Sequence, residues 1–275
     1  MNLADAGELK GFLRKHGLKA DKGLGQHFLC APDIVQAIVN AAGNYSGCLE
    51  VGPGPGILTS FLAKKSVAMT AVEFDPRMVN LLADSAPTCK VIVADALRVD
   101  LFEILSELPE PRVLVSNMPY YITGPLLARF SEVRALVGAM VLMMQKEVGE
   151  KIVAEPKNRV RGALSVNIQS QFTVEMVVKA PGSAFMPPPK VDSVVLKLTP
   201  RAEVFPDGFA KVVKAGHMQP RKTLLNNLGS TFRKERGEVF EVLKQNGLFE
   251  TARGFELTET QWVALTESIM KLGWT

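Results

Sequence analysis

The chain has 275 residues, of which 47% are hydrophobic and 22% charged. These values are close to the globular average and exclude a disordered chain or a collagen. A chain of this length fits one large domain, or a large and a small one, whose core needs no disulfide or metal. The three cysteines show no CxxC pair and the three histidines are dispersed, so we expect neither a disulfide framework nor a metal site.

The amino terminus, MNLADAGELK, lacks the apolar run of a signal peptide. The longest apolar run, near residues 136–144, is about half as long as a membrane-spanning helix. We therefore expect a cytoplasmic protein with no membrane partner, and we expect it to be a monomer.

Net charge is only +4, but the positive charges are clustered. Residues 10–22, which end in Lys22, carry a balance of +4, and residues 211–236, which include Arg221 and Lys222, carry +6. Two basic segments suit a protein that presents cations to a nucleic acid, although ordinary solvated helix faces would give the same counts.

Short β-branched and apolar runs alternate with helical patterns along the first half of the chain. Strands are predicted at 48–52, 69–73, 91–94, 112–117 and 138–144, and helices at 32–42, 58–65, 76–85 and 124–130. This alternation predicts a parallel sheet covered by helices on both faces. Two more strand-like runs, 173–179 and 192–199, are joined by a proline-rich loop without a helix, so they should pair antiparallel. The fold class is therefore α/β, a seven-stranded Rossmann-like sheet of the kind found in methyltransferases.

The strand signals stop after Pro200. Short helices are expected beyond it, with breaks at Gly216, Pro220, Gly229, Gly237, Gly247 and Gly254. Thr258 is the expected N-cap of a final amphipathic helix. We therefore predict two domains, with residues 1–200 forming the sheet domain and residues 201–275 a small all-helical domain.

A glycine-rich turn follows the first predicted strand, in the sequence Glu50-Val-Gly52-Pro-Gly54-Pro-Gly56. Glycines let the backbone turn tightly and let a ligand lie against the main chain. Such a turn alone suits NAD, FAD or S-adenosylmethionine (SAM), or is a plain turn. Pro55 stands where a dinucleotide-binding turn must wrap a pyrophosphate. Because SAM has no phosphate, the prolines favour SAM.

Acidic residues end the next two predicted strands. Glu73 lies about 20 positions beyond the glycines, where a carboxylate can accept hydrogen bonds from both ribose hydroxyls. Asp95 and Ala96 end the third strand, where they can accept a hydrogen bond from an adenine amino group. The order of these features again favours SAM over NAD.

The fourth predicted strand ends in Asn117-Met118-Pro119-Tyr120, which resembles the motif of enzymes that methylate an exocyclic amino group. Adenine N6 is a poor nucleophile because its lone pair is delocalised into the ring. The side-chain oxygen of Asn117 and the carbonyl of Met118 can accept its two hydrogens, Pro119 fixes the turn, and Tyr120 can stack on an extruded base. A strand-end turn with a capping asparagine is the alternative for this motif alone.

Several segments match one family in order and spacing. They are residues 22–29 (KGLGQHFL), the EVGPG turn, Glu73, Asp95, NMPYYIT from Asn117, residues 185–193 (FMPPPKVDS) and residues 219–224 (QPRKTL). From about residue 20 to its end, the chain resembles the ribosomal RNA adenine dimethyltransferase family, and within it the bacterial small-subunit enzymes. The resemblance implies SAM-dependent dimethylation of N6 of two adjacent adenosines near the 3′ end of 16S rRNA, during late assembly of the small subunit.

The resemblance also implies residue roles. It places His27, Leu29, Gly52, Gly54, Glu73, Asp95, Ala96 and Asn117 around SAM, with residues 1–30 as an extension that closes over the cofactor. Tyr120 and Phe185 would sandwich the target adenine, while Lys22, Arg221 and Lys222 would bind rRNA. His27 stands where many members have asparagine, and Pro220 interrupts a run that is often Arg-Arg-Lys.

Three other functions remain open. The first is a large-subunit rRNA adenine methyltransferase of the macrolide-resistance type, whose catalytic motif looks alike. The second is an assembly factor that keeps the fold without catalysis, against which the intact Glu73, Asp95, Asn117 and Tyr120 speak. The third is a small-molecule methyltransferase, which would leave the basic segments unused.

Overall fold

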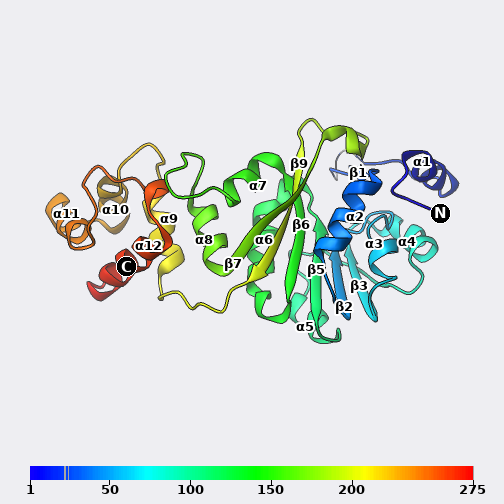
Figure 1. The fold of residues 1–275 in the computed structure, drawn as a ribbon, viewed down its shortest axis with the longest axis horizontal. Coiled ribbons are helices and arrows are strands. Elements are labelled where there is room, and N and C mark those ends of the chain that lie inside the picture. The colour runs from blue at the N-terminus through cyan, green and yellow to red at the C-terminus, as the bar shows by residue number, and fades with distance from the viewer. Residues whose placement is uncertain (22, 24, 275) are drawn as a thin grey trace. The chain divides into compact units, whose positions relative to one another are not determined.

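A computed structural model describes residues 1–21, 23 and 25–274. The chain divides into two compact units (Figure 1). The first unit comprises residues 1–149 and 174–200, and the second comprises residues 150–173 and those from 201 onward. The sequence placed all of residues 1–200 in one domain, so the structure differs in the segment 150–173, which belongs with the helical unit.

The large sheet contains seven strands in the order β4-β3-β2-β5-β6-β9-β7. Their bounds are β2 Gly47–Val51, β3 Ala68–Glu73, β4 Lys90–Val93, β5 Arg112–Asn117, β6 Ala139–Gln145, β7 Phe172–Ala180 and β9 Ser193–Pro200. Neighbours from β4 to β6 are parallel, and β9 runs antiparallel to β6. The prediction of a seven-stranded sheet with flanking helices is confirmed, and each strand lies within one residue of its predicted range.

Helices lie on both faces of this sheet. They are α2 Pro32–Ala41, α3 Thr59–Leu62, α4 Val79–Ser85, α5 Leu101–Ser106, α6 Thr123–Glu132 and α7 Lys146–Ile152, with 3₁₀ turns η2 Pro76–Met78, η3 Tyr120–Ile122 and η4 Arg134–Leu136. Strands β2 and β6 are buried at nearly every position, as expected where both faces of a parallel strand are covered. One core cluster joins the apolar side of α2 to alternate residues of β5 and β6, including Val113, Val115 and Val141.

A second, two-stranded sheet was not predicted. Strand β1 (Phe28–Leu29) pairs antiparallel with β8 (Phe185–Met186), which follows the 3₁₀ turn η5 (Gly182–Ala184). Helix α1 (Ala6–Lys15) precedes β1, and the Asp5 side chain caps it by accepting hydrogen bonds from Gly7 and Glu8. The β1–β8 pair fixes the segment before α2 to the proline-rich loop.

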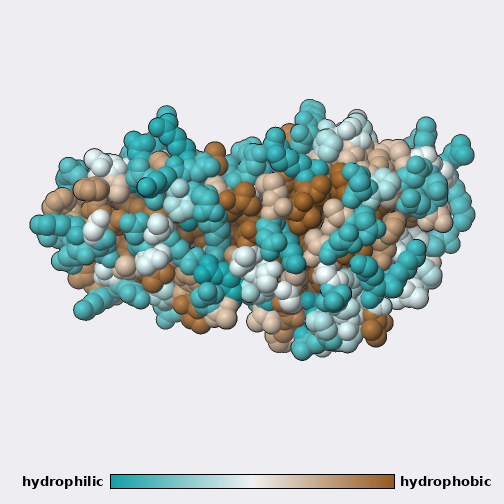
Figure 2. Space-filling model, viewed as in Figure 1, coloured by the Kyte–Doolittle hydropathy of each residue, from teal (hydrophilic) through white to brown (hydrophobic). Residues whose placement is uncertain are grey.

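The second unit is built from α8 Ala163–Gln171, α9 Phe209–Gly216, α10 Leu224–Phe232, α11 Arg236–Gln245, η6 Gly254–Glu256 and α12 Glu259–Lys271. Its core surrounds Trp262, which is fully buried. Thr258 caps α12 as predicted, whereas Gly229 and Gly237 lie inside α10 and α11, so the breaks predicted at those two glycines are wrong. On the face shown in Figure 2, hydrophilic residues cover much of this unit. Among the described residues, no helix has the length and apolar character needed to cross a bilayer.

The central strand β5 should carry much of the stability of the first unit. Leu114→Ala removes a fully buried side chain from it and should lower the free energy of unfolding by about 2–5 kcal/mol. Phe102, 59% exposed on α5, provides the control, because Phe102→Ala should change stability by less than about 0.5 kcal/mol. Urea unfolding followed by circular dichroism measures both, and equal losses would contradict the core assignment.

Candidate functional site

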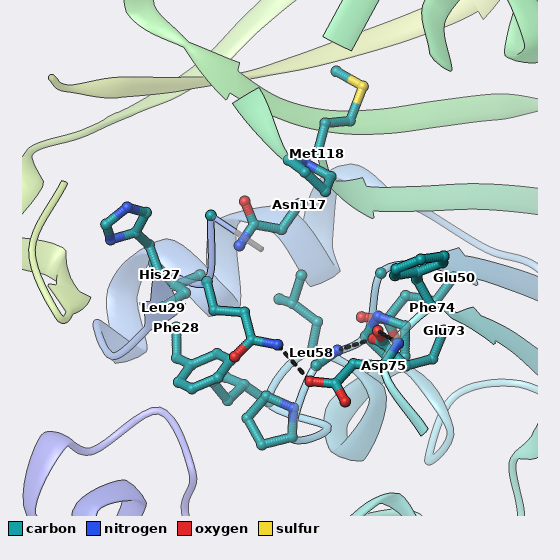
Figure 3. A pocket seen from close by; sticks show the side chains of 18 of the residues that line it. His27, Phe28, Leu29, Glu50, Leu58, Glu73, Phe74, Asp75, Asn117 and Met118 are labelled. Carbon is teal, nitrogen blue, oxygen red and sulfur yellow. Dashed lines mark hydrogen bonds between the residues drawn. The ribbon is translucent and has the colours of Figure 1, made fainter. Parts of the chain in front are cut away.

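A pocket opens at the carboxyl ends of the parallel strands (Figure 3). It is lined by residues from three places, namely the segment 25–29, the turn after β2 with the end of β3, and the turn after β5. In Figure 3 the Asn117 amide points into the pocket, His27 lies on one side, and Glu50 and Glu73 lie on the other. The structure thus brings together His27, Leu29, Gly52, Gly54, Glu73, Asn117, Met118, Pro119 and Tyr120 from the predicted set.

The turn after β2 needs its glycines. Gly52, Gly54 and Gly56 have φ angles of +73°, +56° and +90°, which L side chains rarely adopt. A Cβ on Gly56 would clash with the Ser85 hydroxyl, whereas one on Gly52 would have only the Asn117 carbonyl oxygen, 3.8 Å away, among its near neighbours. The backbone at Gly52 therefore leaves room for a ligand to approach closely.

Glu73 is held by backbone donors. Its two carboxylate oxygens accept hydrogen bonds from the N–H groups of Gly54 (2.9 Å) and Asp75 (2.8 Å). Burial raises the pKa of Glu73, and these hydrogen bonds oppose that effect. Each oxygen keeps a second lone pair, so the carboxylate can still accept from the two hydroxyls of a ribose.

Glu50 is a pocket residue that the sequence analysis did not assign to the site. It is 1% exposed, and its Oε2 atom has no hydrogen-bond partner in the described part of the chain. Burial, with a smaller contribution from the charge of Glu73, raises the pKa of Glu50 to about 8. Glu50 lies one residue before the end of the buried strand β2. This position next to the glycine turn was the signal in the sequence that could have assigned Glu50 to the site.

Gln26 and Asp75 form a second contact that the sequence analysis did not identify. Gln26 donates a hydrogen bond of 2.8 Å from Nε2 to Asp75 and accepts one at Oε1 from the N–H of Asp21. Arg77 binds Asp75 with its guanidinium and holds the pKa of that carboxyl below its usual range. This network ties the segment that precedes β1 to the end of β3 beside Glu73.

Asp95 and Ala96 line an adjoining hollow. It shares Gly52, Glu73 and Pro119 with the main pocket, so the two hollows lie next to each other. Asp95 accepts a hydrogen bond from the N–H of Leu97, which fixes the turn after β4. The exposed aromatic side chains of Phe74 and Tyr121 also border both hollows.

The turn after β5 carries the other predicted group. In the described part of the chain, the Asn117 amide has no hydrogen-bond partner. The N–H of Met118 donates to the Met143 carbonyl (3.0 Å), and the Met118 side chain is buried. The Tyr120 hydroxyl lies 2.7 Å from the Ser193 hydroxyl, and burial raises the pKa of Tyr120. Asn117 is therefore free to bind a ligand, while its neighbours are fixed.

Three of the predicted residues that the structure describes lie away from this pocket. Phe185 is 3% exposed, belongs to the core beside β1 and does not line the pocket, so here it offers no face for a base. Arg221 and Lys222 lie on the exposed turn between α9 and α10 of the second unit. Lys22 lies outside the described residues.

These groups could hold a nucleoside. The Glu73 carboxylate could accept hydrogen bonds from its ribose hydroxyls, the hollow at Asp95 could take its base, and the backbone at Gly52 leaves room for a substituent on the sugar. A second substrate with an amino group could then bind at the Asn117 amide, which lies between His27 and Glu73 in the view of Figure 3.

Comparisons with known proteins agree with this geometry. The family model described as "Ribosomal RNA adenine dimethylase" matches residues 17–266. The "Ribosomal RNA small subunit methyltransferase A" of Streptococcus thermophilus is 35% identical over 99% of this chain and 100% of that protein, and the protein of the same name from Geobacillus thermodenitrificans is 34% identical over 98% of each.

Two solved structures have similar folds. A dimethyladenosine transferase from Plasmodium falciparum has a TM-score of 0.75 and 26% identity, covering 90% of this chain and 99% of that one. The 23S rRNA methyltransferase ErmE has a TM-score of 0.66 and 26% identity, covering 88% of this chain and 99% of that one.

The raised pKa of Glu50 predicts a pH-dependent stability. Between its usual pKa of 4.5 and about 8, the folded protein holds a proton that the unfolded chain releases, so stability falls as pH rises through this range. Glu50→Gln removes this loss. The Tm of the variant relative to the parent should therefore rise between about pH 5 and pH 9 in differential scanning calorimetry.

The exposed Glu103 on α5 supplies the control, because Glu103→Gln makes the same chemical change at the surface. An equal rise of the Tm difference in this variant would show that the effect does not come from the burial of Glu50. A Tm difference for Glu50→Gln that stays constant with pH would show that Glu50 is ionised in the folded protein.

Proposed function

Because the chain belongs to the ribosomal RNA adenine dimethylase family, as the sequence predicted, we propose that it transfers methyl groups from SAM to N6 of two adjacent adenosines near the 3′ end of 16S rRNA, late in small-subunit assembly. The observation that carries this proposal is the Asn117 amide, which points into a pocket shared with the glycine turn and has no hydrogen-bond partner among the residues that the structure describes. The small-subunit target rests on full-length relatives named for that subunit.

The cofactor assignment rests on the residues around the turn. His27, Leu29, Gly52, Gly54, Glu73, Asp95, Ala96 and Asn117 are proposed to surround SAM, and residues 1–30 to close over it. The closure is supported by the Gln26–Asp75 hydrogen bond and by the pairing of β1 with β8. Bound SAM supplies an electrophilic methyl group on a positively charged sulfur.

The target amine is proposed to bind at the turn after β5. Asn117 Oδ1 and the Met118 carbonyl accept the two N6 hydrogens, which favours a pyramidal nitrogen and directs its lone pair at the methyl group. Pro119 and the fixed Tyr120 shape the site, and the Tyr120 ring stacks on the extruded base. Catalysis then comes from positioning and preorganised acceptors, and no strong base is needed, since the alkylated nitrogen loses its proton readily.

RNA binding is proposed for three basic residues. Lys22, Arg221 and Lys222 would contact rRNA phosphates. The second unit, in which the basic segment 211–236 runs from α9 to the start of α11, would serve as the helical rRNA-binding domain. Such contacts release counterions and make affinity fall steeply with salt.

The second candidate is a methyltransferase of large-subunit rRNA, since the fold of a 23S rRNA methyltransferase is also similar. The full-length identity to small-subunit methyltransferases favours the first candidate. Transfer of tritiated methyl groups from SAM to purified subunits that lack these modifications separates the two. N6,N6-dimethyladenosine in small-subunit RNA alone supports the proposal, label in large-subunit RNA alone selects the second candidate, and no label in either contradicts both.

Removing the Asn117 amide should impair the chemical step. Asn117→Ala should lower kcat for methyl transfer to small subunits by about 100-fold or more, since it deletes a preorganised acceptor. Asn40→Ala, at an exposed position on α2, should keep full activity. Single-turnover assays with saturating SAM measure both, and a kcat within threefold of the parent for Asn117→Ala would remove Asn117 from the site.

The turn between α9 and α10, which carries Arg221 and Lys222, should bind rRNA through phosphate contacts. The double variant Arg221→Ala/Lys222→Ala should weaken binding to small subunits and reduce the slope of log K against log salt by about 2. Filter binding at several salt concentrations measures the slope. An unchanged slope would show that these two side chains stay in solvent and do not contact RNA phosphates.

A further inference from the structure

We propose that the loop between α7 and α8 is a binding site for rRNA phosphates, formed by Lys157 and Arg159 and adjoining the turn that carries Arg221 and Lys222. This inference rests on the proposed function, because the phosphates would belong to the RNA substrate. The sequence analysis drew its basic residues from two other segments and placed this loop in the sheet domain, whereas the structure places it in the second unit.

Lys157 has a backbone conformation that lysine rarely adopts. Its φ angle is +73°, and Arg233 is the other non-glycine residue with a positive φ among those that the structure describes. The N–H of Lys157 donates a hydrogen bond of 2.9 Å to the carbonyl of Phe255, which helps to hold this conformation. The left-handed region costs free energy for any residue that has a Cβ, and glycine would avoid that cost. The lysine therefore supplies something that glycine lacks, and we assign that role to its ammonium group.

The base of the loop is fixed from inside the second unit. Arg161 is 5% exposed, and its guanidinium donates hydrogen bonds to the side-chain oxygen of Gln169 (2.8 Å) and to the carbonyl of Ala154 (3.3 Å). Gln169 donates in turn from Nε2 to the carbonyls of Ile152 and Ala154. These contacts hold the chain on both sides of the exposed residues 157–160. A loop that is already fixed loses little conformational entropy when it binds a ligand.

The loop presents positive charge to solvent. Lys157 and Arg159 are both exposed, and in the part of the chain that the structure describes neither of them forms an ion pair. Residues 153–162 contain three cationic side chains and one carboxylate, that of Glu155, so the loop keeps a surplus of positive charge. Exposed cations without carboxylate partners suit the phosphates of a nucleic acid, and each such contact releases condensed counterions.

Backbone hydrogen bonds connect this loop to the turn at residues 219–224. Lys157 bonds to the carbonyl of Phe255, and Leu224, the first residue of α10, donates to the carbonyl of Ala252 (2.7 Å). The loop and the turn thus contact the same short segment of the second unit. Their cationic side chains consequently lie on adjoining parts of its surface, where one RNA strand can contact both sets.

Removing the two charges should weaken RNA binding without weakening the fold. The double variant Lys157→Gly/Arg159→Ala should lower the affinity for purified small subunits by about tenfold and reduce the slope of log K against log salt by about 2. Because glycine accepts the left-handed backbone, the Tm should stay within about 2 °C of the parent. The variant Lys157→Arg/Arg159→Lys keeps both charges and should bind as the parent does. Filter binding at several salt concentrations and differential scanning calorimetry measure these quantities.

Lys90 on the first unit supplies the control, because its ammonium group is already paired with Glu107. Lys90→Ala should leave both the affinity and the salt slope unchanged. Parental affinity and slope in the double variant would overturn the proposal. Loss of binding in the charge-keeping variant together with a lowered Tm would overturn it as well, since the loop would then have a structural role. Failure of the unsubstituted protein to bind or methylate small subunits would instead contradict the proposed function, so the two failures are distinguishable.

Discussion

Parallel hydrogen bonding of β2 to both β3 and β5 sets the positions of the polar groups in the pocket. In this register Val51 pairs with Val72 on one side and with Ser116 on the other. The next residues along the three strands are Gly52, Glu73 and Asn117, which consequently lie at one edge of the sheet. A shift of one residue in either pairing would turn Glu73 or Asn117 to the other face. The buried apolar residues of these strands therefore maintain the site as well as the fold.

The pocket concentrates buried acidic groups, which is costly in a protein interior. Glu73 is stabilised by two backbone N–H groups, and Asp75 by Arg77 and Gln26. Within the described residues the Oε2 atom of Glu50 has no hydrogen-bond partner, and burial raises the pKa of Glu50 to about 8. A ligand that carries positive charge, as SAM does on its sulfur, would offset part of this cost.

Local sequence patterns predicted the seven long strands because hydrophobic runs, glycine turns and proline positions are local signals. They could not predict the β1–β8 pair, since two-residue strands carry almost no periodicity and their partners are far apart in the chain. The same limit explains Phe185, whose burial follows from that pairing. The assignment of residues 150–173 to the helical unit likewise depends on packing between distant segments. Asp5, which caps α1, was a readable signal that the sequence analysis did not use.

The positions of Glu73, Asp95 and Asn117 beside the pocket were predictable, because each of them ends or closely follows a strand. The site was less predictable where a contact depends on side-chain direction, as for Gln26 with Asp75. The motif spacing placed His27 near the pocket, and the structure places it among the residues that line the pocket.

The central claim is that one pocket holds the cofactor at Glu73 and the target amine at Asn117. A crystal structure of the full chain with S-adenosylhomocysteine tests it most directly. The account predicts the ribose hydroxyls on the Glu73 carboxylate, the adenine in the hollow at Asp95, and the sulfur at the Asn117 side of the glycine turn. A ligand bound with its ribose away from Glu73, or with Asn117 hydrogen-bonded inside the protein and turned out of the pocket, would contradict the account.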